Sequence, residues 1–131
     1  QVAATRLVEL YRKHQHEVDT SVRNAVAKAW MDAEAYALSV YATAGRLMSG
    51  GKIGPESSTN KIFWSELDIH LHRTALQILG DRAELMPGAP DAGDVGDWLE
   101  DYVFALAGPI YAGSNEIQRN IIAERMLNLP R

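Results

Sequence analysis

Apolar residues recur every three or four positions along most of this chain, the spacing that places side chains on one face of an α-helix. The clearest stripe predicts one long helix over about 21–48, and consists of Val22, Val26, Ala29, Ala33, Tyr36, Val40, Ala44 and Leu47. Asp19 or Thr20 is expected to cap it, because their side-chain oxygens accept free backbone N–H groups. The many alanines in the stripe indicate close packing against other helices.

Four further segments carry the same pattern, and we expect helices at about 2–15, 55–79, 95–107 and 115–127. Their apolar stripes are Val2, Leu7, Leu10 and Tyr11; Phe63, Leu67, Leu71, Thr74 and Ile78; and Trp98, Tyr102 and Leu106. Glycine and proline separate the segments, and residues 80–97 are expected to form a loop. No segment alternates with the period of a strand. The sequence therefore predicts an all-α fold, an antiparallel four-helix bundle with an additional short helix.

Size and charge limit the classes of function. The chain has 131 residues, which suits a single domain, and its net charge of -4 disfavours nucleic acid as the main partner. It has no cysteine, which excludes disulfides and thiolate sites and is compatible with the cytoplasm. No membrane span or signal peptide is apparent. The first residue is Gln1, so we expect the chain to begin after processing or partway through a longer protein.

Metal and nucleophile motifs give little support for a site. The histidines occur as the pairs His14/His16 and His70/His72, and side chains two positions apart on a helix point to different faces. No Glu-x-x-His motif of di-iron bundles, no phosphate-binding loop and no nucleophile elbow occurs. We expect no metal. The three tryptophans, Trp30, Trp64 and Trp98, are interpreted as core or interface residues.

The last predicted helix begins directly after small residues, at Gly113-Ser114-Asn115. Such a backbone allows close approach of a ligand, and a helix N-terminus offers free N–H groups and partial positive charge. The segment therefore indicates either an ordinary helix cap or an anion site suited to a phosphate or pyrophosphate.

Three stretches together resemble one family. The ending "AGSNEIQRNIIAERMLNLPR" is similar to the C-terminus of acyl-CoA dehydrogenases, "GPESSTNKIFWSEL" resembles a Gly-Pro-Glu-x-Ser helix of that family, and "ALQILG" resembles its Gln-x-x-Gly segment. Order and spacing agree over essentially the whole chain. The resemblance implies that residues 1–131 are the C-terminal helical domain of a longer flavoprotein, which has FAD between its domains and a neighbouring subunit.

The resemblance also implies roles for particular residues. Gly113, Ser114 and Glu116 correspond to positions that contact FAD near its pyrophosphate and ADP portion. Gln77 and Gly80 correspond to a segment that touches the ADP part across a subunit interface. The family continues after that glycine with a second glycine, whereas this chain has Asp81 and Arg82. An Arg-x-x-Phe-Gly motif that holds FAD in many members was not found; "DTSVRNAVAKAW" occupies that region.

The usual catalytic base is missing. The family position for the glutamate that removes the substrate α-proton is Ala112, which cannot accept a proton. Some branches place the base on the first bundle helix, where Glu9 is the one visible candidate. The sequence around Glu9 resembles the later half of that helix, so we expect the base upstream of Gln1.

Three readings follow. In the first, the full-length protein is an acyl-CoA dehydrogenase of bacterial lipid and fatty acid metabolism that desaturates an acyl-CoA and passes electrons to an electron-transfer flavoprotein or similar acceptor. The fragment alone is then inactive, lacks FAD and self-associates through exposed apolar faces.

In the second hypothesis, the chain is a non-catalytic scaffold or a non-catalytic subunit of a heteromeric dehydrogenase. The third, a metal-binding bundle, predicts bound metal. Acyl chains from short to steroid side chains all remain open.

Overall fold

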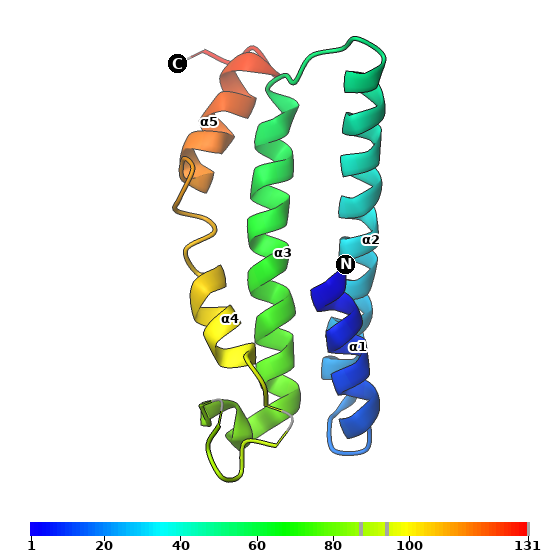
Figure 1. The fold of residues 1–131 in the computed structure, drawn as a ribbon. Helices are drawn as coiled ribbons and strands as arrows, with labels where there is room; N and C mark the ends of the chain where they lie inside the picture. Colours follow the sequence, from blue (N-terminus) through cyan, green and yellow to red (C-terminus); the bar gives the residue numbers. More distant parts are fainter. Residues whose placement is uncertain (87, 94, 131) are drawn as a thin grey trace.

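The computed structural model describes residues 1–86, 88–93 and 95–130. Its helices are α1 (Val2–His14), α2 (Thr20–Met48), α3 (Glu56–Leu79), the short 3₁₀ helix η1 (Gly80–Glu84), α4 (Trp98–Ala105) and α5 (Asn115–Arg125). The described residues form no strand, so the all-α prediction is confirmed. Figure 1 shows α1 and α2 on one side of α3, with α4 and α5 following each other along its other side. The fourth helix of the bundle is thus built from two short ones.

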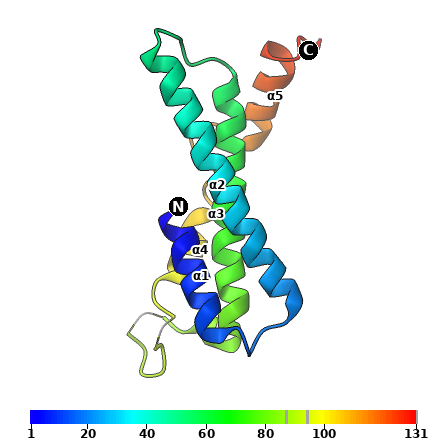
Figure 2. The ribbon, with the colours of Figure 1, turned by 90° about the vertical axis from the view of Figure 1, so that its right-hand side faces the viewer.

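The apolar core lies in one half of the bundle, where α1 covers α2 and the C-terminal half of α3 (Figures 1 and 2). Its buried members are Ala4, Leu7, Leu10, Val26, Ala29, Ala33, Leu67, Leu71, Ala75, Ile78, Leu79, Ala92, Val95 and Trp98. Alanines at the α2 contact allow the helix backbones to come close. We call this half the core half, and the part formed by the C-terminal half of α2, the start of α3 and α5 the open half.

The predicted cap of α2 is confirmed at Asp19. Its carboxylate accepts hydrogen bonds from the backbone N–H groups of Ser21 at 2.7 Å and Val22 at 3.2 Å. These bonds hold the pKa of Asp19 below its usual range, the Ser21 hydroxyl having the largest effect. The cap marks the start of α2 at Thr20, one residue before the predicted boundary.

The long α2 stripe is only partly a core stripe. Val26, Ala29 and Ala33 are buried as expected, but Val40, Ala44 and Leu47 are exposed. The reason is that α1 packs only against the first half of α2 (Figure 2). In the second half, the start of α3 contacts α2 on one side only, as in the stacked Tyr36 and Phe63 rings, and the described residues leave the rest of that surface exposed. Helical spacing correctly predicted a face but not the length over which it is covered. Val2, Phe63 and Leu106, also placed in predicted stripes, are exposed as well; Val2 and Leu106 lie at helix ends.

The loop prediction for 80–97 missed the short helix η1 and two buried residues. Gly80 ends α3 with a positive φ of 57°, but the chain continues into η1 instead of an open loop. Ala92 and Val95 are buried in the core although they lie outside any helix. The helix expected at 95–107 is shorter, Trp98–Ala105, and the one expected at 115–127 ends at Arg125. Pro87, Asp94 and Arg131, which belonged to the predicted loop and tail, lie outside the described residues.

Candidate functional site

The segment between α4 and α5 makes a sharp turn with two consecutive left-handed residues. Ala112 has φ of 55° and Gly113 has φ of 85°. Glycine adopts this conformation readily, whereas for alanine the side-chain carbon crowds the backbone. Ser114 then returns to extended geometry and caps α5 by accepting a hydrogen bond from the backbone N–H of Ile117 at 3.4 Å. The predicted start of the helix at Asn115 is confirmed.

Asn115 fixes the start of α5 to α3. Its side chain is only 3% exposed, and its Oδ1 accepts a hydrogen bond from the Lys61 ammonium at 2.8 Å. Its Nδ2 donates to the Ser65 hydroxyl at 3.1 Å and to Glu66 Oε1 at 3.4 Å. Its backbone N–H donates to the carbonyl of Pro109 at 2.8 Å, which closes the loop before the helix. The buried amide is thereby fully hydrogen-bonded, as buried polar groups require.

Close contact with α3 continues just before the turn, at Gly108. A Cβ on this residue would lie 3.0 Å from the carbonyl oxygen of Ala105 and 3.2 Å from the Ser65 Cβ. Tyr111 contacts Trp64 with ring centroids 6.1 Å apart. A glycine at position 108 therefore allows the chain to pass close to Ser65 and enter the turn.

The outer side of the turn carries alternating charges and remains accessible. Gln118 donates to the carbonyl of Ala112 at 3.3 Å, and Arg119 pairs with Glu66 at 2.7 Å. Gly113 and Glu116 are exposed and Ser114 is half-buried, so an external molecule can reach all three. The pKa of Glu116 lies below its usual value, because its carboxylate accepts hydrogen bonds from its own backbone N–H and then from the Ser114 hydroxyl.

The two groups of predicted FAD contacts are far apart in this chain. Gln77 is exposed near the C-terminal end of α3, and Gly80 follows that helix, whereas the turn lies against Ser65. Twelve residues of helix rise by roughly 18 Å, so these two groups cannot bind the same end of one ligand. Asp81 and Arg82, which replace the family glycine, both lie in η1.

Ala112, at the family position of the catalytic glutamate, and Glu9, the one visible candidate base, are both exposed. Ala112 lies at the turn, with its carbonyl oxygen bound to Gln118. Glu9 lies on the solvent-facing side of α1. Neither is enclosed with another titratable group, so the described residues form no acid–base pair at either position.

A polar cluster that the sequence analysis missed joins α1, α3 and α4. Asp101 lies 3.5 Å from Arg6 and 3.8 Å from His72, and the Arg6 guanidinium lies 4.6 Å above the Trp98 ring. Asp68 lies 3.5 Å from His72. Burial raises the pKa of Asp68, although the nearby His72 opposes that shift. The signal available in the sequence was the i, i+4 spacing of Asp68 and His72, which does not by itself show that His72 is buried.

The remaining histidines do not form a metal centre. His14 is buried and lies 3.1 Å from Glu17, while the Nε2 of His70 is buried without a hydrogen-bond partner. Across residues 1–86, 88–93 and 95–130, no group of three or more His, Cys, Asp or Glu side chains could hold a metal ion.

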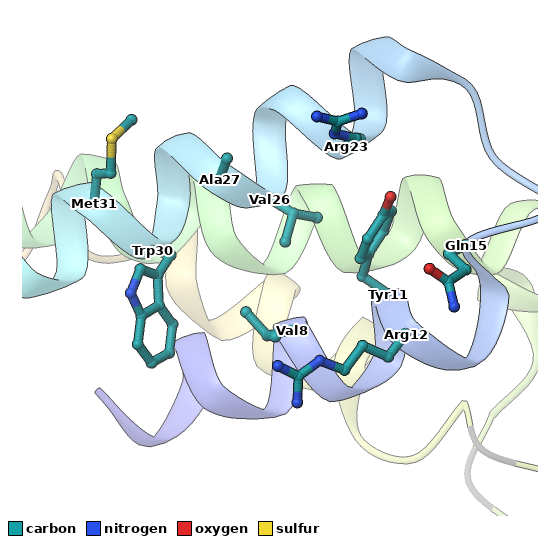
Figure 3. Close-up of a pocket in the computed structure, with 9 residues that line it drawn as sticks. All are labelled: Val8, Tyr11, Arg12, Gln15, Arg23, Val26, Ala27, Trp30 and Met31. Carbon is teal, nitrogen blue, oxygen red and sulfur yellow. The ribbon is translucent and has the colours of Figure 1, made fainter.

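A separate groove of about 580 Å³ lies between α1 and α2 (Figure 3). Val8 and Trp30 lie on its two sides, and Arg12 and Arg23 are also part of its lining. Trp30 is half-exposed there, whereas Trp98 is buried in the core and Trp64 lies near the turn. The groove is on the opposite side of α3 from the turn, so the two are distinct surfaces.

None of the helices in the described part of the chain is long and apolar enough to cross a membrane. Residues 5–127 match the family model for the C-terminal domain of acyl-CoA dehydrogenases. The chain belongs to the acyl-CoA dehydrogenase family.

Similar proteins agree with this assignment. The chain is 36% identical over 129 residues to acyl-CoA dehydrogenase IpdE1 of Mycobacterium tuberculosis and 33% identical over 128 residues to IpdE1 of Mycolicibacterium smegmatis. In each case 97% of this chain is covered, but only 31% and 30% of the relative. The chain thus spans about a third of the length of these curated acyl-CoA dehydrogenases.

Among solved structures, the Tcur3481-Tcur3483 steroid ACAD is similar in fold. Its TM-score is 0.83 with 23% identity, over 98% of this chain and 33% of that chain. A variant of the same protein gives a TM-score of 0.84 over 98% of this chain and 34% of its own. The all-α fold predicted from the sequence is therefore also the fold of these acyl-CoA dehydrogenase domains.

Proposed function

We propose that residues 1–131 are the C-terminal helical domain of a longer FAD-dependent acyl-CoA dehydrogenase. In this proposal the intact protein forms an α,β-double bond in an acyl-CoA thioester, and this domain supplies FAD contacts and oligomer surface. When bound, the flavin accepts a hydride from the substrate β-carbon. The observation that supports an FAD contact is the accessible turn at Gly113, Ser114 and Glu116, held against α3 at a helix N-terminus.

The charge at the turn refines what it would bind. The Glu116 carboxylate already accepts the backbone N–H and the Ser114 hydroxyl at the start of α5, so it occupies part of the space that a phosphate would need. Two anions at one helix N-terminus repel each other. A carboxylate accepts hydrogen bonds from hydroxyl groups instead. The role that fits Glu116 is therefore recognition of a cofactor hydroxyl, with the phosphate contacts left to backbone N–H groups of the turn.

The separation of the two predicted contact groups supports an oligomer. Since Gln77 and Gly80 are roughly 18 Å along α3 from the turn, we propose that they serve a second FAD, bound mainly by a neighbouring subunit. Exposed apolar residues on α4 and beyond it, such as Phe104 and Ile110, supply surface that subunit contacts would cover.

The proton-abstracting base lies outside the described residues in this proposal. Ala112 has no proton-accepting group, and Glu9 is exposed on α1 without a residue that would orient it. We propose that a carboxylate upstream of Gln1 removes the α-proton. Electrons then pass to an electron-transfer flavoprotein or a similar acceptor, and the protein acts in the cytoplasm.

The substrate class follows from relatives only. Because the similar solved structure is described as a steroid ACAD, CoA thioesters of steroid-derived acids are the substrates to test first.

Ala112 supports a second candidate function, a non-catalytic subunit of a heteromeric dehydrogenase. A subunit that carries no base still contributes FAD contacts and stabilises its partner. The similar solved structure, a steroid ACAD, carries two protein names, Tcur3481 and Tcur3483. Its similarity to this chain is one of fold.

The test is to purify the full-length gene product alone and with the product of any adjacent dehydrogenase gene. Flavin absorption that bleaches on addition of a steroid-derived acyl-CoA is the expected result for a catalytic protein. Bleaching only in the two-component complex supports the non-catalytic subunit. Absence of flavin in every combination contradicts both.

A further inference from the structure

The first residue of α5 is connected to α3 by polar contacts rather than by an apolar core. Asn115 is the buried residue of this helix, while Ile117, two residues further along, is 52% exposed. Alongside the exposed Arg119–Glu66 ion pair and the half-buried Ile121 and Ile122, the hydrogen bonds of this one buried amide fix where α5 begins on α3. A buried amide is directional, since it must point its oxygen at donors and its nitrogen at acceptors.

The partners of this amide determine its orientation. The Lys61 ammonium donates to Oδ1 at 2.8 Å, while Nδ2 lies 3.4 Å from the Glu66 carboxylate and 3.1 Å from the Ser65 hydroxyl. An inverted amide would place its NH₂ group against an ammonium and its oxygen against a carboxylate. Ser65 itself is fully buried, and its hydroxyl also donates to the carbonyl of Ile62 at 3.0 Å.

This arrangement places the cofactor-facing groups. Asn115 lies between Ser114 and Glu116 in the sequence, so any displacement of its Cα carries both neighbours with it. We infer that Asn115 and Ser65, with Lys61 as the orienting cation, are positioning residues that hold the Gly113–Glu116 turn for cofactor binding. The inference rests on the proposed function. None of the three needs to touch the cofactor.

A positioning role and a purely structural role differ in what a substitution changes. The apolar core lies at the other end of the bundle, around Leu7, Leu71 and Ile78. Loss of the hydrogen bonds that join Asn115 to Lys61, Ser65 and Glu66 should therefore raise the FAD dissociation constant clearly, while the unfolding temperature falls only a little. Ser58 is the matched control, because it is a buried serine on α3 two turns before Ser65 and lies outside the Asn115 network.

The experiment measures the FAD dissociation constant of the full-length protein by flavin fluorescence quenching, with the partner polypeptide present if wild type needs it. Variants are Ser65→Ala, Asn115→Leu and the control Ser58→Ala. We expect the dissociation constant to rise about fivefold for Ser65→Ala and more than tenfold for Asn115→Leu, since each lost hydrogen bond contributes about 1 kcal/mol. Ser58→Ala should leave the FAD dissociation constant unchanged.

A paired exchange keeps the inference testable if Asn115→Leu folds poorly. In Asn115→Asp a carboxylate faces Glu66, and FAD binding should weaken. Adding Glu66→Gln replaces that repulsion by an amide donor, so binding should recover by at least threefold while Lys61 keeps its acceptor. Wild-type affinity in both Asn115→Leu and Asn115→Asp overturns the positioning role and leaves the proposed function intact. Failure of wild type to bind FAD in any combination overturns both.

Discussion

The two halves of the bundle are stabilised differently. In the core half, α1, α2 and α3 bury Leu7, Val26 and Leu71 against one another. In the open half, the buried residues are polar, Ser58 and Asn115. Apolar side chains such as Leu38 on α2 and Ile117 on α5 are exposed, whereas Ile121 and Ile122 are half-buried. The same helices α2 and α3 run through both halves, and in residues 1–131 α1 packs against them in the core half only (Figure 2).

This contrast separates what the chain stabilises by itself from what needs another surface. Burial of apolar area drives folding, and the core half supplies it within the chain. The open half exposes Leu38, Tyr41 and Met48 on α2, an extent of apolar surface typical of contact sites. The turn proposed to contact FAD precedes α5 and so belongs to the open half. Hydrogen bonds to α3 hold it there, and a cofactor or a neighbouring subunit would add further contacts.

The largest expected effect is the loss of stability when a core residue of the core half is truncated. Leu7 is 0% exposed, and Leu7→Ala should lower the free energy of unfolding by about 3 kcal/mol, because a cavity replaces packed side chain. Leu38, which is 67% exposed in the open half, provides the control, and Leu38→Ala should change stability by less than about 0.5 kcal/mol. Urea denaturation of both variants checks this. Equal losses would show that the open half is also packed.

A smaller effect concerns the strained turn. Ala112 has φ of 55°, so Ala112→Gly should stabilise the protein by about 0.5–1 kcal/mol through relief of that conformation. Ala42, exposed within α2, should respond in the opposite direction, with Ala42→Gly costing about 1 kcal/mol. The thermal unfolding temperatures of the two variants should move apart. A fall in both would mean that residue 112 is not left-handed in solution.

The pH dependence of the core half tests the cluster around Asp68. Burial raises the pKa of Asp68 above its ordinary value of 3.8, so the folded chain binds this proton more tightly than the unfolded chain. The stabilisation is present at pH below 3.8 and is lost as pH rises through the folded pKa. Asp68→Asn removes that dependence. Relative to wild type, the variant should gain stability between acidic and neutral pH, by less than about 1 kcal/mol.

Urea denaturation of wild type and Asp68→Asn at several pH values measures this difference directly. Asp32→Asn on α2 is a control carboxyl outside the cluster. A stability difference between wild type and Asp68→Asn that does not change with pH would contradict the assignment.

The smallest expected effect on stability accompanies a change in association. Phe104 is 70% exposed on α4, and Phe104→Ser should leave the unfolding free energy within about 0.5 kcal/mol of wild type. Self-association of the 131-residue chain, followed by light scattering at increasing concentration, should weaken. A strict monomer for the unmodified chain at high concentration would contradict the view that these apolar faces are contact surfaces.

The sequence predicted the helices well because their stripes and breakers are local features. Asp19 and Ser114 cap helices through contacts within three residues, which a sequence shows directly. It could not show that Val40, Ala44 and Leu47 of the α2 stripe are exposed, because burial depends on contacts with helices distant in the sequence. It also missed the buried Val95, which no periodic pattern marks in a glycine-rich loop.

For the candidate site, the sequence likewise predicted the local turn but not the long-range contacts that hold it. The position of the turn followed from Gly113-Ser114-Asn115, and its accessibility in the structure agrees with a binding role that stays a prediction. The hydrogen bonds from Asn115 to Lys61 and Ser65 join residues about fifty positions apart, so no local pattern reveals them. Likewise, the sequence could not show the distance between Gln77 and the turn, because that distance depends on where the turn packs along α3.

The most direct test of the central claim, that the turn contacts FAD, is amide hydrogen exchange of the full-length protein with and without FAD. The account predicts slower exchange on FAD binding in peptides covering 112–119, and in an oligomer also around 77–80. Peptides covering Val8 and Trp30 in the α1–α2 groove should exchange at the same rate in both states. Unchanged exchange at 112–119 in a protein that demonstrably holds FAD would contradict it.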